Sequence, residues 1–192
     1  PDRAVWRARD DVRTLDLALH GGLRLEGEAD VEGADETVLV ADAGDPVGAA
    51  LGAPLTHRRL MSCARATAAR ERLAARDHTL ALAPYAHLFG LIVGGIAPLL
   101  AGGRVTAHDM LAPSSALAIL EGEGVSTLVA PPATFAGLLE ALAQRGRALD
   151  APVLQRCFAG GAALDAALAR RWYHETGVLL HRGDVLGADG AL

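Results

Sequence analysis

From about residue 36 onward, short runs of branched apolar residues alternate with longer segments in which alanine, leucine and arginine recur at helical spacing. The short runs predict buried parallel strands, and the longer segments predict the helical crossovers that join such strands. The expected strands are 37–41, 79–83, 104–108, 126–130, 153–158 and 178–181, and the expected helices are 56–75, 114–123, 134–144 and 165–176. The pattern therefore predicts an α/β fold with a mostly parallel sheet flanked by helices.

The first 35 residues follow a different pattern. Three extended segments, 4–8, 12–19 and 23–27, with a Gly-Gly turn between the last two, predict an antiparallel edge or flap. We therefore expect a short extended segment at residues 1–35 and an α/β domain at residues 36–192, the two forming one compact domain.

Individual residues predict where the helices begin and end. Ser114 and Asp165 are expected N-caps, because their side chains can accept a hydrogen bond from a helix N-terminal amide. Gly177 is the expected C-cap of the last helix. The arginines between 65 and 76 are expected to form a solvated helix face.

Composition narrows the function classes. The chain has 192 residues, of which 51% are hydrophobic and 21% charged, and this balance is typical of a globular domain. Its net charge of -5, from 18 basic and 23 acidic residues, excludes the basic surface that holds a nucleic-acid backbone. All 18 basic residues are arginine, so any step that needs a lysine is excluded within this chain.

The remaining composition predicts a cytoplasmic protein without a metal. Cys63 and Cys157 are too few for a disulfide framework or a zinc site, and they predict reduced thiols. Pro84 and His87 interrupt the most apolar stretch, and the chain starts without a signal-like segment, so neither a membrane span nor a signal peptide is expected. The late histidines and aspartates match no metal-ligand spacing.

Five short motifs occur in a fixed order between Thr56 and Gly177. They are Thr56-His57-Arg58-Arg59-Leu60, Pro84-Tyr85-Ala86-His87-Leu88-Phe89-Gly90, Pro98-Leu99-Leu100-Ala101-Gly102-Gly103, Pro131-Pro132 followed by Leu138-Leu139, and Gly160-Gly161-Ala162-Ala163-Leu164. In this order they resemble the central part of the adenylate-forming (AMP-binding) superfamily, which includes acyl-CoA synthetases, adenylation domains of peptide synthetases and luciferases. The resemblance covers roughly two thirds of the chain and implies part of the family's N-terminal domain.

The resemblance implies a phosphate-binding loop just before Thr56. In the family this loop reads Ser-Gly-Thr-Thr-Gly-x-Pro-Lys-Gly, and counting back places residues 44–52 there. Leu51 replaces the lysine, and Asp45 brings a negative charge to the place where phosphate oxygens sit. We therefore expect a loop remnant that binds ATP poorly, in which the remaining glycines are Gly44, Gly48 and Gly52.

The family's second chemical motif, Tyr-Gly-x-Thr-Glu, has two candidate alignments. A gapless count from Gly160 places residues 184–188 there, and the aromatic and glutamate side chains are then missing. The other alignment matches Arg182–Val185 to a later segment, Arg-Thr-Gly-Asp-Leu, and makes Asp184 a candidate ribose ligand. The family's third essential group is a lysine on a separate C-terminal domain, and we expect this chain not to supply it, because the sequence contains no lysine.

The same resemblance implies a remnant of the acyl pocket. Its candidate residues are His87, Phe89, Gly160, Gly161 and Ala162. A structural histidine and a plain tight turn remain alternative interpretations of His87 and of the glycine pair, and Phe89 is expected in the core in either case. No catalytic residue and no nucleophile triad are predicted.

The leading hypothesis is a degenerate or truncated homologue of AMP-dependent acyl-CoA synthetases. It would be unable to adenylate a carboxylate alone, would need no cofactor, and would act as a binding, structural or assembly partner, with a small acyl ligand in the pocket remnant. An open sheet face predicts a homodimer. The alternative is an acid-CoA or acid-carrier-protein ligase fragment, completed by another chain and using ATP, AMP and CoA. A third interpretation is a nucleotide-binding module that holds AMP or CoA through Asp184.

Overall fold

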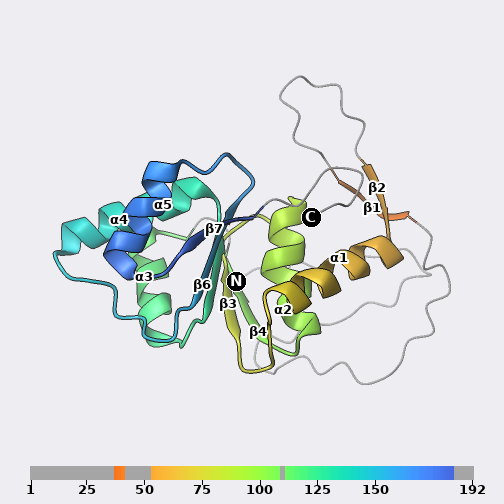
Figure 1. Ribbon diagram of the computed structural model, residues 1–192, viewed down its shortest axis with the longest axis horizontal. Coiled ribbons are helices and arrows are strands. Elements are labelled where there is room, and N and C mark those ends of the chain that lie inside the picture. The colour runs from red at the N-terminus through yellow and green to blue at the C-terminus, as the bar shows by residue number, and fades with distance from the viewer. Residues whose placement is uncertain (1–36, 42–52, 109–110, 184–192) are drawn as a thin grey trace, which may run out of the picture. The chain divides into compact units, whose positions relative to one another are not determined.

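The computed structural model describes residues 37–41, 53–108 and 111–183. A two-stranded antiparallel sheet is formed by β1 (Thr37–Ala41) and β2 (Ala53–Thr56). A second, parallel sheet has the order β4-β3-β5-β6-β7 (Figure 1). Its strands are β3 (His78–Ala81), β4 (Arg104–Ala107), β5 (Thr127–Ala130), β6 (Arg156–Gly160) and β7 (Leu180–Gly183).

Helices cover both faces of the parallel sheet (Figure 1). They are α1 (His57–Arg70), the π-helical segment η1 (Gly90–Ile96), α2 (Ala97–Leu100), α3 (Pro113–Gly122), α4 (Pro132–Arg145) and α5 (Ala166–Thr176). The main core lies between the sheet and α3, α4 and α5, where the rings of Phe135 and Trp172 meet edge to face with centroids 4.8 Å apart. Helices α1 and α2 and segment η1 cover the other face. The predicted α/β fold is confirmed.

The strand order contains one reversal of direction. From β3 the chain passes through η1 and α2 to β4 on one side, and then crosses through α3 to β5 on the other side of β3. The helices of these two connections lie on opposite faces of the sheet. In open parallel sheets, ligands bind outside the carboxyl ends of the strands at such a switch point. The loops that follow β3 and β5 are therefore the expected place for a ligand.

Several element boundaries differ from the predicted ones. Helix α1 ends at Arg70 rather than at residue 75, because Arg72 adopts a left-handed conformation with φ of 51°. Ser114 is not an N-cap, because Pro113 already occupies the first turn and Ala112 precedes it. Strand β6 begins at Arg156 rather than at 153, because a turn closed by the Leu154 amide and the Ala151 carbonyl precedes it.

Two further differences concern the first strands. β1 was expected to belong to the parallel sheet, but it pairs with β2 in a separate antiparallel sheet. β2 was not predicted; it runs directly into α1, and its short sequence carries no alternation of apolar and polar residues.

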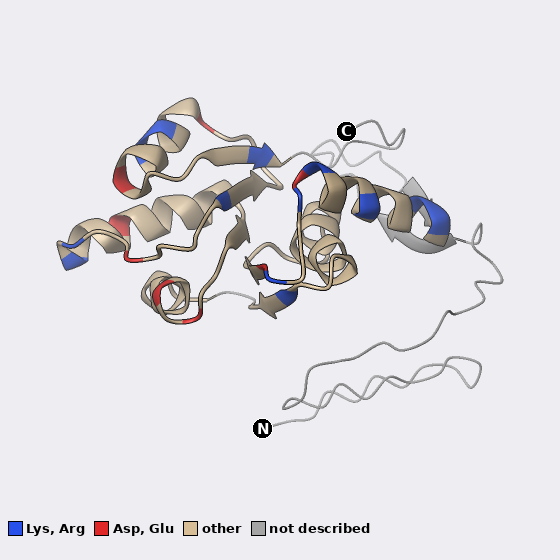
Figure 2. Cartoon of the chain, turned by 60° about the horizontal axis from the view of Figure 1, so that its bottom comes forward, with Lys and Arg blue, Asp and Glu red and all other residues tan. Residues whose placement is uncertain are grey.

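The remaining expectations concern the ends of α5, the arginines near α1, membrane-spanning helices and segments outside the described residues. Asp165 caps α5 by accepting a hydrogen bond from the Ala167 amide, and Gly177 ends that helix with φ of 73°. Figure 2 shows basic residues along α1, where Arg65 and Arg70 are exposed. Arg72 and Arg76, which were expected on the same helix face, are also exposed but follow the end of the helix. No helix in the described part of the chain is long and apolar enough to cross a membrane. The segment at 1–35, the loop at 44–52 with Gly44, Gly48 and Gly52, and Asp184 lie outside the described residues.

Candidate functional site

The candidate site lies at the carboxyl ends of β3, β5, β6 and β7. Beyond the end of β3, the amides of Leu82 and Ala83 both donate to the carbonyl of Val129, at 2.8 and 3.2 Å. Hydrogen bonds to β5 therefore continue past the end of β3 as far as Ala83, and the chain leaves the sheet at Pro84. The segment from Pro84 to Gly90 crosses the switch point that the strand order creates.

Gly90 fixes the shape of this segment. A Cβ atom at position 90 would lie 2.2 Å from the Pro84 carbonyl oxygen and 2.8 Å from that of Ala83, so only glycine fits. The His87 amide donates to the Pro84 carbonyl at 3.1 Å and closes a turn. The proline, the turn and the glycine bring η1 directly onto the end of β3, and this close approach explains the sequence motif in physical terms.

The Phe89 ring lies over the ends of β6 and β7. A Cβ atom at Gly160 would be 2.6 Å from the ring, and one at Gly183 would be 2.2 Å from Phe89 Cε2. Phe89 is 4% exposed and packs with Ala83, Val129 and Phe158. The predicted core position of Phe89 is therefore confirmed, and its ring fills the space above the two strand ends.

His87 and Tyr85 are the exposed side chains of the segment that carry polar groups. Within the described residues the His87 imidazole has no hydrogen-bond partner, so it is available to a ligand. The Tyr85 hydroxyl donates to the Gly94 carbonyl at 3.4 Å, and its ring lies beside Gly94 and Gly95 of η1. Burial of the phenol raises the pKa of Tyr85, so it stays a neutral donor. Together they form a surface that can donate hydrogen bonds and also offers apolar area.

The glycine turn after β6 precedes helix α5. Gly161 has φ of 78°, which a residue with a side chain rarely adopts, and Ala162 is exposed. The N-terminus of α5, however, is already capped by the Asp165 carboxylate, whose Oδ1 lies 3.0 Å from the Ala167 nitrogen. An anion approaching this helix end would meet that negative charge. The turn is thus better suited to a neutral group than to a phosphate.

A second aromatic contact lies beside Phe89. The rings of Phe158 on β6 and His181 on β7 are tilted by 38° with centroids 5.8 Å apart. His181 is exposed, and it shares a sheet face with Phe158 because the two residues are register partners. His181 thus extends the site along β7.

The opposite, amino-terminal edge of the sheet holds a buried polar cluster. The Asp77 carboxylate forms an ion pair with Arg156 at 2.9 Å and accepts from the Ser126 hydroxyl at 2.9 Å. Burial raises the pKa of Asp77, but hydrogen bonds from the Ala74 amide, at 2.8 Å, from Ser126 and from Arg156 outweigh it, so the pKa is lowered. Ser126 faces the carboxylate rather than the neighbouring imidazole of His78. The cluster therefore has the residue types of a hydrolytic triad but not its order, and it joins β3, β5 and β6.

His78 joins this edge to β4 and α3. Arg104 Nη2 lies 2.7 Å from His78 Nδ1 and 2.8 Å from the Glu123 carbonyl oxygen, so Nδ1 must accept the arginine proton. Nε2 then carries the hydrogen and donates to Thr106 Oγ1 at 2.8 Å. Burial lowers the pKa of His78, and the Arg104 charge adds to this effect. His78 is therefore neutral and structural.

A third charged group ties α3 to the end of α4. Glu121 pairs with Arg145 and with Arg147, and it also accepts from the Asp150 amide at 3.1 Å. Hydrogen bonds from Arg145 lower the pKa of Glu121 to about 2. This carboxylate is fully occupied by its partners, so it serves structure rather than chemistry.

The described residues offer no further reactive centre. Cys157 is buried, and this burial raises its pKa to about 12, so it is not a thiolate nucleophile. No three histidine, cysteine or acidic side chains in the described ranges lie close enough together to hold a metal ion.

The structure brings together most of the residues that the motifs indicate. His87, Phe89, Gly160 and the Gly161-Ala162 turn all lie at the carboxyl edge of the sheet, but Phe89 and Gly160 contribute packing, and His87 contributes an exposed polar group. Sequence reasoning did not select Tyr85. The signal for it was its difference from the family motif, which has leucine at that position. It also missed His181, whose place beside Phe158 depends on strand order.

Comparison with known proteins matches the chain to one family. The profile of the family described as AMP-binding enzyme matches residues 48–183. A medium-chain fatty-acid–CoA ligase of Escherichia coli (strain K12) is 29% identical over 136 residues, a match that covers 71% of this chain and 24% of the ligase. The chain thus spans about a quarter of the length of this curated relative.

Solved structures show the same fold. ATP-bound MatB from Rhodopseudomonas palustris superposes with a TM-score of 0.66 at 25% identity, covering 79% of this chain and 30% of MatB. The N-terminal domain of FACL13 from Mycobacterium tuberculosis gives a TM-score of 0.71 at 21% identity, covering 84% of this chain and 39% of that domain's chain. The similarity therefore extends over most of the fold described above.

Proposed function

The chain belongs to the AMP-binding enzyme family, and from this premise we propose that it binds an acyl ligand but does not adenylate a carboxylate by itself. The loop after β3 presents Tyr85 and His87 to solvent, and the Asp165 carboxylate in the loop after β6 is used as a helix cap. The absence of lysine from the whole sequence is the observation that carries the proposal.

We propose that the described part of this edge does not hold ATP. The Phe89 ring occupies the space over Gly160 and Gly183, and the Asp165 carboxylate faces any anion at the start of α5. Neither feature provides the positive charge or the open cradle that phosphates require. We therefore assign no reaction step to ATP in this chain. The proposed role is binding or assembly within an acyl-CoA ligase-like scaffold.

Tyr85 and His87 are the proposed ligand contacts. His87 can donate a hydrogen bond to a carboxylate or carbonyl oxygen, and the Tyr85 ring, 42% exposed, offers apolar area to an acyl chain. The cytoplasm remains the proposed compartment. If the homodimer forms, it belongs to the same proposal of an assembly role.

Pyrophosphate exchange tests the proposal. The purified chain, given a carboxylate, ATP and labelled pyrophosphate, is expected to show exchange no faster than the reaction without carboxylate, whereas a full-length acyl-CoA ligase run in parallel shows clear exchange. Carboxylate-dependent exchange by this chain alone would overturn the proposal.

Calorimetry tests the binding half. We expect heat on titration with an acyl-CoA, and we expect the affinity to fall about tenfold, or roughly 1.4 kcal/mol, in His87→Ala. Tyr173→Ala is the matched control, because Tyr173 is also an exposed aromatic residue but lies on α5. No heat with acyl-CoA would disprove the acyl pocket, and heat with AMP but not acyl-CoA would favour the nucleotide module.

A ligase fragment completed by another polypeptide is the second candidate. Its support is the likeness to a CoA ligase of which the chain spans only 24%. Such a partner would have to supply the lysine that this chain lacks. Exchange activity that appears only when the chain is mixed with a polypeptide carrying the rest of a family ligase would establish this candidate.

A further inference from the structure

A row of polar residues crosses three strands of the parallel sheet. Thr79 on β3 is the register partner of Thr127 on β5, and Thr127 is the register partner of Arg156 on β6. The neighbouring residues Leu80 and Leu128 belong to the core beneath α3, α4 and α5. Because successive side chains of a strand point to opposite faces, the three polar residues share the other face. We call Thr79, Thr127 and Arg156 the polar row.

Each member of the polar row contributes a buried polar atom without a hydrogen-bond partner among the described residues. These atoms are Oγ1 of Thr79, Oγ1 of Thr127 and Nε of Arg156. The two threonines are 0% and 2% exposed. Buried polar groups in folded proteins bond to other protein groups or to ordered water, because an unpaired group costs free energy. Three such atoms in one row therefore call for a common partner.

The ion pair of Arg156 brings its Nε–H group toward the two hydroxyls. Nη2 lies 2.9 Å from Asp77 Oδ2 and Nη1 lies 3.5 Å from Asp77 Oδ1, so the two terminal nitrogens face the carboxylate and Nε does not. Asp77 precedes β3, and β5 lies between β3 and β6 in the sheet. The arginine side chain therefore crosses β5 on the face to which Thr127 and Thr79 point.

The charges beside the polar row select the kind of molecule that fits it. The Asp77 carboxylate neutralises Arg156, so the row offers an anion no net positive charge. The guanidinium repels a cation, and its Nε–H group can only donate a hydrogen bond. Each threonine hydroxyl can accept one. The row therefore fits a small neutral molecule that accepts one hydrogen bond and donates two, and water has these properties.

We propose that the polar row binds one ordered water molecule. The water accepts a hydrogen bond from Arg156 Nε–H and donates one to each of the hydroxyl oxygens of Thr79 and Thr127. Three hydrogen bonds to otherwise unpaired groups are typical of a buried water. The site extends the Asp77 cluster across β3, β5 and β6, three of the four strands whose carboxyl ends carry the candidate site. The inference does not depend on acyl binding.

The direction of a stability change tests the inference. Thr127→Val replaces the hydroxyl by a methyl group and removes one partner of the water. We expect the equilibrium constant for unfolding, measured by urea denaturation, to rise roughly fivefold to tenfold. A hydroxyl without any partner would give the opposite result, because its removal relieves an unpaired buried group. A fall in the unfolding constant of Thr127→Val would therefore overturn the inference.

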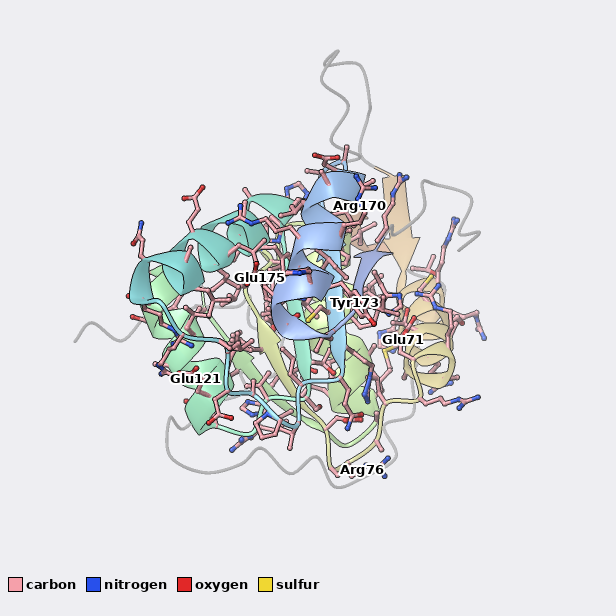
Figure 3. All side chains as sticks on the ribbon, turned by 60° about the vertical axis from the view of Figure 1, so that its left-hand side comes forward. Glu71, Arg76, Glu121, Arg170, Tyr173 and Glu175 are labelled. Carbon is pink, nitrogen blue, oxygen red and sulfur yellow. The ribbon has the colours of Figure 1, made fainter. Side chains whose placement is uncertain are left out.

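Oxygen-17 magnetic relaxation dispersion of the solvent water counts the long-lived internal waters directly. The double variant Thr79→Val/Thr127→Val is expected to hold one such water fewer than the original chain, and Thr127→Ser, which keeps the hydroxyl, is expected to hold the same number. Thr176→Val is the control. Thr176 follows Glu175 at the end of α5 (Figure 3), and its hydroxyl donates directly to the Trp172 carbonyl at 2.8 Å.

The control separates loss of the water from loss of stability. Thr176→Val removes a direct hydrogen bond, so it should lower stability and leave the number of long-lived waters unchanged. An unchanged number in Thr79→Val/Thr127→Val would overturn the inference, and so would an equal decrease in Thr176→Val. A stability that rises with chloride concentration at constant ionic strength, and does so only while both hydroxyls are present, would assign the row to an anion instead.

Discussion

Phe89 and His87 stand two positions apart in one motif but have separate roles. The Phe89 ring is held between the ends of β6 and β7, where glycine is the only residue that leaves it room, and Gly90 lets η1 approach the Pro84 carbonyl. His87 projects outward from the same segment and is exposed. One short motif therefore contains both a packing residue and an exposed residue, and we propose that the exposed one contacts the ligand.

The contact between Phe89 and Gly183 gives a direct prediction. In Gly183→Ala the new methyl group would lie 2.2 Å from Phe89 Cε2 unless the ring moves. Overpacking of this kind costs about 1–3 kcal/mol of unfolding free energy, which urea denaturation measures. Shortening the ring in Phe89→Leu should recover part of the loss in the double variant, because the two residues are in contact.

Gly122→Ala is the control for this substitution. It adds the same methyl group at the end of α3, where nothing lies within 4 Å. We expect it to leave stability unchanged or to raise it by about 0.5–1 kcal/mol. An equal loss in both variants would show that the Phe89 contact is not the cause.

At the scale of elements, the sequence predicted the types of most strands and helices of the parallel sheet but not all of their ends. Hydrophobic periodicity and capping residues were sufficient to predict both ends of α5, because its caps, Asp165 and Gly177, were both expected. The end of α1 depends on the left-handed conformation of Arg72, which composition does not indicate. The pairing of β1 with β2 is a nonlocal choice, and local patterns carry no information about it.

The candidate site was predictable to a similar extent. The motifs located the loops that follow β3 and β6, because Pro84–Gly90 and Gly160–Leu164 each come directly after a predicted strand. They did not show that Phe89 fills the space above Gly160, since that contact joins residues far apart in sequence. Nor did they indicate the cluster around Asp77 and Ser126, which assembles only when β3 and β5 pair.

His78 makes the junction of β3, β4 and α3 sensitive to pH. Its folded-state pKa lies below the ordinary value of 6.5, so the unfolded chain binds the proton more tightly. The stability that neutral His78 provides is therefore complete above about pH 6.5 and is lost as the pH falls below that value. One proton limits the slope to about 1.4 kcal/mol per pH unit.

Unfolding free energies between pH 7.5 and pH 5.5, about one unit on each side of the ordinary histidine value, measure this effect. His78→Gln keeps hydrogen-bonding capacity but cannot be protonated, so its stability should depend less on pH over this range. His87→Gln is the control, because it makes the same substitution at an exposed position outside this junction. Asp77 and Glu121, whose pKa values are lowered, do not titrate in this range. An unchanged slope in His78→Gln would assign the acid sensitivity to other groups.

At the scale of the whole molecule, fold and chemistry are separable. The chain keeps the α/β sheet of adenylate-forming enzymes over most of its described length, and its TM-score of 0.66 with an ATP-bound relative shows how closely. Yet it spans only 24% of a curated ligase and contains no lysine. Packing is local to the sheet and its helices, so it survives in a part of the protein, whereas catalysis needs groups brought together from several parts.

Leu51→Lys tests whether restoring one positive charge is sufficient to restore ATP binding. The family resemblance places a phosphate-binding lysine at this position, and one charged hydrogen bond contributes about 1.5 kcal/mol, so ATP affinity measured by calorimetry should rise roughly tenfold. Leu51→Gln, similar in length but uncharged, should bind ATP no better than the original chain. Pyrophosphate exchange should stay at background in both variants, because catalytic groups act as a unit and we propose that the other groups of the site are missing from this chain. Exchange in Leu51→Lys alone would instead mean that the rest of the active site is intact and that a single substitution silenced it.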